Sequence, residues 1–478
     1  MKSSALFTDF YELTMAQGYW KYELDTKAVF DVFYRRQPFK GGFSVFAGLD
    51  PLLDTVQNFR FSGEDLEWLQ SQDCFDPAFL AYLEGFKFSG DIYAVPEGEL
   101  IFPQEPLLRI HGGLIEAQII EGLVLNSINF QSLIATKSAR VTMAARDHKV
   151  MEFGLRRAQG FDGAMSASRA AYIGGAASTS NSLAARTLGI PAMGTMAHSW
   201  VMAFPSELES FEAYADLYPD ATTLLIDTYD TLESGLPNAI KVGRRLAAAG
   251  KRFGVRLDSG DIDYLSAKVR AALDTEGLKD AFIVVSNELD EEIIEHLVSV
   301  GAPVDVWGVG TNLVTGGTEA SFTGVYKLSA VERDGQLVPT MKFSDNPEKR
   351  TNPGVKDLYR LYDEAGMAVA DVMTLAGESV TPGKAATYFH PSLDTRRFSY
   401  VACGEVRPML GKVMESGRRL FPAATMGELR ARCLASLQSF DATFLRFLNP
   451  HVYKVSLSEG LRNLKFQFLE RNGLSAYH

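Results

Sequence analysis

Apolar segments alternate with helical segments between about residues 149 and 330, and this alternation constrains the fold most. Apolar runs such as Leu224-Leu-Ile226 suit strands that are buried on both faces of a parallel sheet. The spacing leaves room for one helix between successive strands, so the pattern predicts a βα array, either a barrel or an open sheet. The predicted strands are 150–154, 189–194, 222–227, 252–258, 281–286, 304–310 and 324–331.

Two of the helices in this array are predicted from apolar stripes at helical spacing. One stripe falls within residues 262–273 and the other within 289–300. Asn287 is the predicted N-cap of the second helix, and Gly301 is its predicted end. The array therefore has both the strand and the helix signals of an α/β domain.

The two terminal zones have mixed character. The first zone predicts a helix over residues 9–20 and a long apolar helix over 115–136, with strands at 28–34, 91–95 and 107–110. The last zone has no clean linker before it, so we expect it to pack on the first zone. The predicted domains are an N-terminal α+β segment (1–140), a catalytic α/β domain (141–335) and a C-terminal segment (336–478).

Composition narrows the class of protein. The chain has 478 residues, 46% of them hydrophobic and 22% charged, and a formal net charge of -12. This charge disfavours nucleic acid or an anionic membrane as the main partner. No apolar run reaches the roughly 18 residues of a membrane span, and Asp9 and Glu12 interrupt any signal-peptide pattern. The three cysteines form no Cys-x-x-Cys pair, so we expect a cytoplasmic protein without disulfides or structural zinc.

Side chains that can bind ligands or take part in catalysis follow the predicted strand ends. Ligands of parallel βα arrays bind at the carboxyl ends of the strands. One such residue alone is ordinary turn chemistry, but six strand ends that share an edge indicate a site. The candidates, in chain order, are Phe153, Arg156, Thr195, His198, Asp227, Arg256, Asp258, Asp261, Asn287, Gly310 and Thr311.

These residue types favour a phosphorylated sugar and a small aromatic acid as ligands. Arginine pairs with carboxylate or phosphate, and glycine loops offer backbone N–H groups to phosphate. The aspartates can hold Mg²⁺ around a polyphosphate or stabilise a cationic sugar-like centre. Phe153 and Tyr11 can enclose a flat ring, and His198 can act as acid, base, ligand or nucleophile. Neither a Gly-x-Gly-x-x-Gly nor a P-loop motif is present.

The chain resembles the nicotinate phosphoribosyltransferase family. The resemblance spans nearly the whole chain in order, and one matching motif is Gly194-Thr-Met-Ala-His-Ser199. It implies a type II phosphoribosyltransferase fold, an irregular α/β barrel with an additional α+β domain formed by the N- and C-terminal segments. The matching segments are 8–20, 33–39, 152–160, 194–199, 255–261, 309–311 and 324–328.

The resemblance also implies an activity and roles for individual residues. Nicotinate and phosphoribosyl pyrophosphate would form nicotinate mononucleotide and pyrophosphate, with ATP and Mg²⁺ required. ATP would phosphorylate His198, with Asp258 and Asp227 as further catalytic and metal-binding residues. Nicotinate would contact Phe153, Thr195, Arg256 and, from the other subunit of a homodimer, Tyr11. The phosphoribosyl group would contact Arg156, Asn287, Gly310 and Thr311.

Three other functions remain open at this point. A nicotinamide phosphoribosyltransferase would need an acidic residue near the ring to accept the amide. A catalytically silent, ligand-sensing relative would have lost His198, Arg256 or Asp258, and all three are present. A barrel aldolase would need a Schiff-base lysine on a barrel strand, for which Lys327 is the candidate.

Overall fold

A computed structural model describes residues 4–344, 349–384, 386–391, 397–400 and 404–471. The chain divides into two compact units: a terminal unit, Met1–Leu133 with Ser321–His478, and a central unit, Ile134–Ala320. No helix within the described part of the chain combines the length and the apolar character that a bilayer crossing requires.

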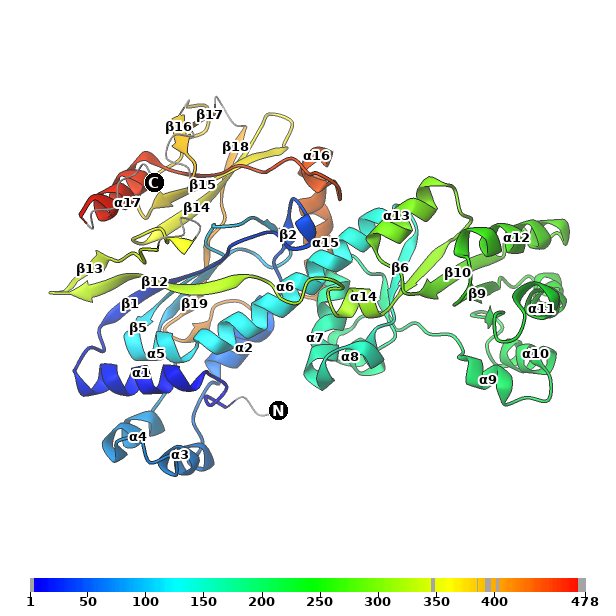
Figure 1. Cartoon of the computed structure of the whole chain (residues 1–478), viewed down its shortest axis with the longest axis horizontal. Coiled ribbons are helices and arrows are strands. Elements are labelled where there is room, and N and C mark those ends of the chain that lie inside the picture. The colour runs from blue at the N-terminus through cyan, green and yellow to red at the C-terminus, as the bar shows by residue number, and fades with distance from the viewer. Residues whose placement is uncertain (1–3, 345–348, 385, 392–396, 401–403, 472–478) are drawn as a thin grey trace. The chain divides into compact units, whose positions relative to one another are not determined.

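The central unit is built on a six-stranded parallel sheet with the order β7-β6-β11-β10-β9-β8 (Figure 1). The parallel register brings the carboxyl ends of its strands to one edge. Its strands are β6 (Lys149–Glu152), β7 (Ser178–Thr179), β8 (Thr223–Leu225), β9 (Gly254–Leu257), β10 (Phe282–Asn287) and β11 (Val306–Val309).

Helices connect these strands, as the apolar stripes predict. In the helix Ile262–Thr275, Val269 and Leu273 are buried, and in Glu291–Ser299 the buried positions include Ile294 and Leu297. The helices are α7 (Gly160–Ile173), α8 (Ser182–Leu188), α9 (His198–Met202), α10 (Glu207–Leu217), α11 (Leu236–Ala248), α12 (Ile262–Thr275), α13 (Glu291–Ser299) and α14 (Thr311–Val314). Short helical turns lie at η2 (Leu155–Arg157) and η3 (Thr231–Gly235).

Two strand predictions need correction. Segment 189–194 forms only an isolated bridge between Ala192 and Thr179, because Gly189 adopts a left-handed φ of 69° and Pro191 lacks a donor. Segment 324–331 is a strand, β12 (Gly324–Arg333), but it pairs antiparallel with β1 in the terminal unit. Its half-exposed burial pattern is typical of a sheet with one solvated face rather than of a doubly buried strand.

The predicted cap at Asn287 is also wrong. Asn287 ends β10, and α13 begins only at Glu291. The carboxylate of Asp290 accepts from the N–H groups of Glu292 (3.0 Å) and Ile293 (2.9 Å) and is the N-cap. Asn287 therefore belongs to the strand end.

The terminal unit contains two larger sheets and a two-stranded pair. The first sheet has the order β13-β12-β1-β5-β3-β19-β20, the second β17-β16-β21-β15-β14-β18, and β2 pairs with β4. In the first sheet the early strands β1, β5 and β3 lie in the middle, and later strands flank them on both sides. Its strands are β1 (Lys27–Tyr34), β3 (Asp91–Ala94), β5 (Leu108–Gly113), β12, β13 (Gln336–Pro339), β19 (Gly411–Glu415) and β20 (Arg418–Arg419).

The remaining elements of this unit include the helix predicted over 9–20, which the structure places at Phe10–Lys21. The other strands are β2 (Ser44–Val45), β4 (Leu100–Ile101), β14 (Lys356–Tyr362), β15 (Ala368–Leu375), β16 (Ala386–Phe389), β17 (Arg397–Tyr400), β18 (Glu405–Pro408) and β21 (Val455–Leu457). The helices are α1 (Phe10–Lys21), α2 (Leu49–Gln57), α3 (Gly63–Gln70), α4 (Pro77–Glu84), α5 (Leu114–Ile119), α15 (Met426–Gln438), α16 (Ala442–Leu445) and α17 (Glu459–Arg471), with a turn η1 (Pro38–Lys40); α6 (Glu121–Ala144) contains the unit boundary.

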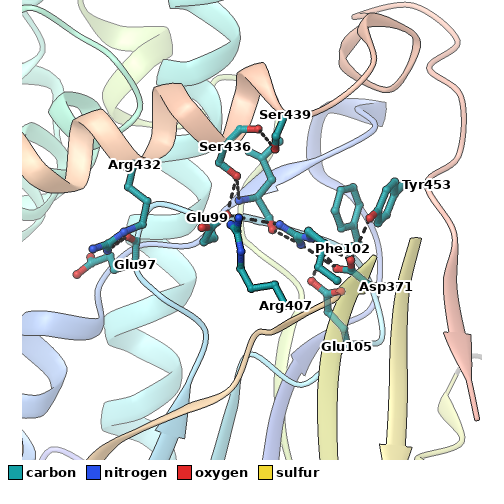
Figure 2. A network of polar contacts seen from close by, with 12 residues as sticks. Glu97, Glu99, Phe102, Glu105, Asp371, Arg407, Arg432, Ser436, Ser439 and Tyr453 are labelled. Atoms are coloured by element: carbon teal, nitrogen blue, oxygen red, sulfur yellow. Dashed lines mark hydrogen bonds and ion pairs between the residues drawn. The ribbon is translucent and has the colours of Figure 1, made fainter. Parts of the chain in front are cut away.

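A buried ionic network joins the early and late segments of the terminal unit. Arg360 on β14 is 0% exposed, and its guanidinium donates to Asp371 on β15 from Nε (2.9 Å) and Nη2 (2.8 Å). Nη2 also donates to the Leu100 carbonyl (2.8 Å), and the Tyr453 hydroxyl donates to Asp371 (3.0 Å; Figure 2). Because these groups are far apart in sequence, the network fixes β4 against the C-terminal sheet.

Arg360→Met should lower the free energy of unfolding by about 3–5 kcal/mol, because it leaves the buried Asp371 carboxylate without its counter-charge. Urea denaturation of the full chain measures the change. The matched control is Arg245→Met, which breaks an exposed ion pair with Asp216 and should cost less than about 1 kcal/mol. Equal losses in the two variants would contradict this role of the network.

Candidate active site

A cavity of about 410 Å³ opens at the carboxyl edge of the central parallel sheet. It brings together nine of the residues predicted from sequence: Phe153, Arg156, Thr195, His198, Arg256, Asp258, Asn287, Gly310 and Thr311. Asp227 lies directly behind this set, in contact with Asp258. Residues that sequence reasoning did not select also line the cavity: Arg157, Ser180, Gly194, Met196, Ala197, Ser286, Glu288 and Gly308.

Arg256 supplies a partly buried positive charge in the site. It lies on β9, and its guanidinium donates to the Thr195 hydroxyl. Its Nε is buried and has no hydrogen-bond partner among the described residues. Burial lowers the pKa of this guanidinium from its ordinary value, whereas the Asp258 and Asp227 carboxylates raise it. A partly buried cation with an unused donor fits a planar carboxylate.

Asp227 and Asp258 form a linked pair of carboxylates at the ends of β8 and β9. Asp227 Oδ2 accepts from the Asp258 N–H (2.9 Å) and from the Ser259 hydroxyl (2.6 Å), while Ser286 donates to Asp258 Oδ1. Asp227 Oδ1 is buried and has no partner among the described residues. An orphaned carboxylate oxygen of this kind fits a hard cation such as Mg²⁺.

The protein alone offers few ligands for a metal. Within the part of the chain that the structure describes, no group of three or more His, Cys, Asp or Glu side chains is arranged to hold an ion. Mg²⁺ in this site would therefore need further oxygen ligands from a bound substrate, in addition to Asp227 and Asp258.

His198 is the first residue of α9 and lies between Thr228 and Asp258. Nδ1 is 3.2 Å from the Thr228 hydroxyl, and Nε2 is 3.7 Å from Asp258 Oδ2. The side chain is 42% exposed. The ring is thus held from both sides yet open to a ligand, an arrangement typical of a nucleophile or an acid–base group.

Phe153 forms an aromatic wall of the cavity. It packs against the buried cluster Met151, Val284 and Val306, which fixes its position after β6. Gly308 on β11 allows this approach, because a Cβ atom at position 308 would lie 2.7 Å from the Phe153 ring. The glycine is therefore required by close packing of the ring against the strand.

Glu152 holds the backbone next to Phe153 in place through its hydrogen bonds, and the sequence analysis did not select it. It is 1% exposed, and its Oε2 accepts from the hydroxyls of Ser168 (2.9 Å) and Thr179 (2.5 Å). Its Oε1 accepts from the Gly154 N–H. The available sequence signal was an acidic residue at the end of an otherwise apolar strand.

Part of the cavity lining has the character of a phosphate site. Arg156 lies exposed on the turn η2, and Gly310 and Thr311 lie at the start of α14. Thr311 Oγ1 is 3.4 Å from Glu288 Oε1. Asn287 has a φ of 120°, a backbone conformation that residues other than glycine rarely adopt.

Two residues from the sequence analysis lie in the terminal unit instead. Tyr11 is on α1, is 51% exposed, and does not line this cavity. Lys327 is on β12, where its ammonium lies 4.0 Å from Glu121. The barrel aldolase hypothesis therefore loses its candidate lysine.

Asn287→Gly should raise the free energy of unfolding by about 1 kcal/mol, because glycine adopts this φ without the steric cost of a Cβ. Denaturation of the purified protein measures the shift. Asn58→Gly makes the same chemical change at a residue with a φ of -109° and should not stabilise the chain. A loss of stability in Asn287→Gly would mean that the side chain outweighs the backbone strain.

Comparison with known proteins identifies the family to which the chain is similar. The model of the nicotinate phosphoribosyltransferase family matches residues 148–365, and models of the N-terminal and C-terminal domains of this enzyme match 6–129 and 355–465. Nicotinate phosphoribosyltransferase of Bacillus subtilis is 40% identical over 467 residues, which cover 97% of this chain and 95% of the relative.

Human proteins support the same grouping. Nicotinate phosphoribosyltransferase of Homo sapiens is 36% identical over 519 residues, covering 96% of this chain and 95% of the relative. A crystal structure of human nicotinic acid phosphoribosyltransferase matches with a TM-score of 0.83 at 33% identity, over 96% of this chain and 99% of that chain. This chain therefore belongs to the nicotinate phosphoribosyltransferase family.

Proposed function

We propose that this chain transfers a phosphoribosyl group from phosphoribosyl pyrophosphate to the ring nitrogen of nicotinate. The C1–oxygen bond to pyrophosphate breaks and a bond from the pyridine nitrogen to C1 forms, which yields nicotinate mononucleotide and pyrophosphate. The observation that carries the proposal is the partly buried Arg256 guanidinium with a buried, unused Nε, in the cavity that Phe153 also lines. A flat ring that carries a carboxylate can pair with the guanidinium through the carboxylate and stack on Phe153 through the ring.

The protein contributes mainly positioning and charge stabilisation. Arg256 and Thr195 hold the carboxylate of nicotinate, and Phe153 lies against its ring. The phosphates of the sugar substrate are held in the same cavity by Arg156, Asn287, Gly310 and Thr311. When both substrates are bound in one cavity, the reaction becomes effectively unimolecular, which removes much of the entropic part of the barrier. The Asp258 carboxylate stabilises the positive charge that develops on the ribose.

Mg²⁺ is part of this proposal. When bound, it neutralises the charge of the pyrophosphate oxygens. Asp227 would hold it through its orphaned Oδ1, with Asp258 beside it, and the substrate would supply the remaining oxygen ligands.

We also propose that ATP phosphorylates His198. The Nε2 atom attacks the γ-phosphorus, the bond to ADP breaks, and water later hydrolyses the phosphohistidine to inorganic phosphate. The added phosphoryl group brings negative charge and acceptor oxygens beside the site, which alters binding of the sugar substrate and pyrophosphate. Hydrolysis thereby couples ATP to turnover.

Three features of architecture complete the proposal. We propose that the central unit is an irregular α/β barrel, which its parallel six-stranded sheet supports. We propose that the terminal unit is a separate α+β domain, which its own sheets support. A cytoplasmic homodimer would bring Tyr11 of one subunit over the nicotinate ring in the other. An exposed tyrosine on α1 supports this role, since offset stacking on the ring is worth about 0.5–1.5 kcal/mol beyond burial.

Arg256→Gln should raise the KM for nicotinate roughly tenfold to a hundredfold, because it removes a charge-assisted hydrogen bond to the carboxylate. The KM for ATP should change little. Steady-state kinetics with each substrate varied in turn measure this split. Arg252→Gln removes an exposed arginine from the same segment and is the control. A matching rise in both KM values would show that Arg256 does not bind the base.

His198→Asn should abolish ATP hydrolysis and acid-labile phosphorylation, because it removes the nucleophilic nitrogen. A slow transfer without ATP should persist, since forming the glycosidic bond does not require phosphohistidine. Radiolabelled ATP and product assays measure the two activities separately. The control His296→Asn changes an exposed histidine on α13. Normal ATP hydrolysis in His198→Asn would rule out the phosphohistidine.

Tyr11→Ala and Arg256→Gln chains should each be weakly active alone and should complement one another when co-expressed. A mixed dimer would contain one site with both residues intact. Random assortment then restores roughly a quarter of wild-type activity. Affinity tags on the two chains isolate the mixed dimer for assay. If it forms and stays inactive, Tyr11 does not act across the interface.

A further inference from the structure

Tyr11 lies in the first turn of α1, and this turn has no capping side chain. The N-cap residue is Asp9, and its carboxylate accepts no cap hydrogen bond. Side-chain caps satisfy the first N–H groups of a helix, which would otherwise lack a partner within the helix. The turn that presents Tyr11 is therefore held by other contacts.

Glu12 makes such a contact from the same turn. Its side chain is 0% exposed, whereas the adjacent Tyr11 is 51% exposed. Glu12 Oε2 accepts from the Nε2 atom of Gln118 on α5, the helix that lies beside α1 (Figure 1). This hydrogen bond joins the first turn of α1 to a helix 106 residues further along the chain.

The Gln118 amide is shared between two carboxylates. Its Nε2 atom also donates to Oε2 of Glu121, the first residue of α6 (3.0 Å). Glu121 Oε1 lies 4.0 Å from the Lys327 ammonium on β12. One chain of polar contacts thus connects α1, α5, α6 and β12, and all four of its side chains belong to the terminal unit.

The electrostatics of this chain of contacts extend to Tyr11. Burial raises the pKa of the Glu121 carboxyl to about 7; the Lys327 ammonium opposes this shift, and the Glu12 carboxylate adds to it. Burial likewise raises the pKa of the Glu12 carboxyl. Partial burial and both glutamates raise the pKa of the Tyr11 hydroxyl, so this hydroxyl lies within electrostatic reach of the pair.

Stability alone does not explain a glutamate at position 12. Its Oε1 atom is buried and has no hydrogen-bond partner among the described residues. An unpaired buried acceptor lowers the stability of a fold, and apolar side chains of similar size often replace buried charged groups without loss. The same helix already buries Leu13 and Ala16. A role in holding the turn explains the carboxylate better than its contribution to folding does.

We propose that Glu12 is a positioning residue: through Gln118, its carboxylate fixes the first turn of α1 and with it the direction of the Tyr11 ring. This inference rests on the proposed function, in which Tyr11 covers the nicotinate ring in the other subunit. A tyrosine on a fixed turn stacks on the ring at little cost in ordering. Loss of the anchor raises that cost and weakens the binding of nicotinate, while the binding of the other substrates stays the same.

Steady-state kinetics of Glu12→Leu test this role, because leucine removes the acceptor and keeps a buried side chain. We expect the KM for nicotinate to rise roughly threefold to tenfold, the effect of one lost hydrogen bond. The kcat and the KM values for phosphoribosyl pyrophosphate and ATP should change little. Glu12→Gln should bring the KM for nicotinate back near the wild-type value, because its amide oxygen accepts from Gln118. Gln118→Leu removes the same contact from the other side and should act like Glu12→Leu.

A double-mutant cycle shows whether Glu12 acts through Tyr11. Tyr11→Ala combined with Glu12→Leu should raise the KM for nicotinate no further than Tyr11→Ala alone, since the effects of coupled residues do not add. The matched control is Glu97→Leu. Glu97 is 2% exposed and holds the first turn of α2 by accepting from the Asp50 N–H (3.1 Å). This control should leave the KM for nicotinate unchanged.

An unchanged KM for nicotinate in Glu12→Leu overturns the inference. Equal rises in Glu12→Leu and Glu97→Leu, or additive effects in the cycle, also overturn it, because Glu12 would then act through general packing or apart from Tyr11. If Tyr11→Ala alone raises the KM, only the positioning role of Glu12 fails; if Tyr11→Ala leaves it unchanged, the proposed role of Tyr11 fails as well. Thermal unfolding verifies that each variant is folded, and Gln118→Leu decides the matter should Glu12→Leu be unstable.

Discussion

Parallel pairing of six strands is the constraint on which the candidate active site depends. Because β6, β8, β9, β10 and β11 run in the same direction, segments more than 150 residues apart in sequence end at one edge. The strand ends and the loops that follow them supply the aromatic wall, the cation, the aspartate pair and the phosphate-site residues of the cavity. Arg256 lies on β9 itself and Asn287 is the last residue of β10.

Electrostatics give the cavity its selectivity. Arg256 is partly buried beside two carboxylates that raise the pKa of its guanidinium, which opposes the effect of desolvation. Asp227 Oδ2 accepts from the Asp258 N–H and the Ser259 hydroxyl, and Asp258 Oδ1 accepts from Ser286, so each carboxylate has one oxygen already engaged. Under the proposed function, the carboxylate of one substrate would pair with Arg256, and the phosphates of the other would reach the aspartates through a metal ion. The whole chain is acidic, so anion binding here depends on local arginines rather than on net charge.

Much of this could be predicted from sequence, and the failures have physical causes. Doubly buried apolar runs such as Leu224-Leu-Ile226 identify strands of a parallel sheet, and strand-end residues then converge by topology alone. Segment 324–331 also contains several apolar residues, but sequence does not reveal that its partner is β1, about 300 residues away. Glu152 was missed because its three partners meet only in the folded chain. The role of Tyr11 stays a prediction, since its partner surface would belong to another subunit.

The central claim is that this cavity selects an aromatic carboxylate and glycosylates its ring nitrogen. The most direct test compares pyrophosphate release by the wild-type chain with nicotinate, nicotinamide and quinolinate, each supplied with phosphoribosyl pyrophosphate, ATP and Mg²⁺. The account predicts that nicotinate gives the highest kcat/KM, because Arg256 pairs with its single carboxylate and gains little from a neutral amide. Equal or faster turnover of nicotinamide or quinolinate would contradict it.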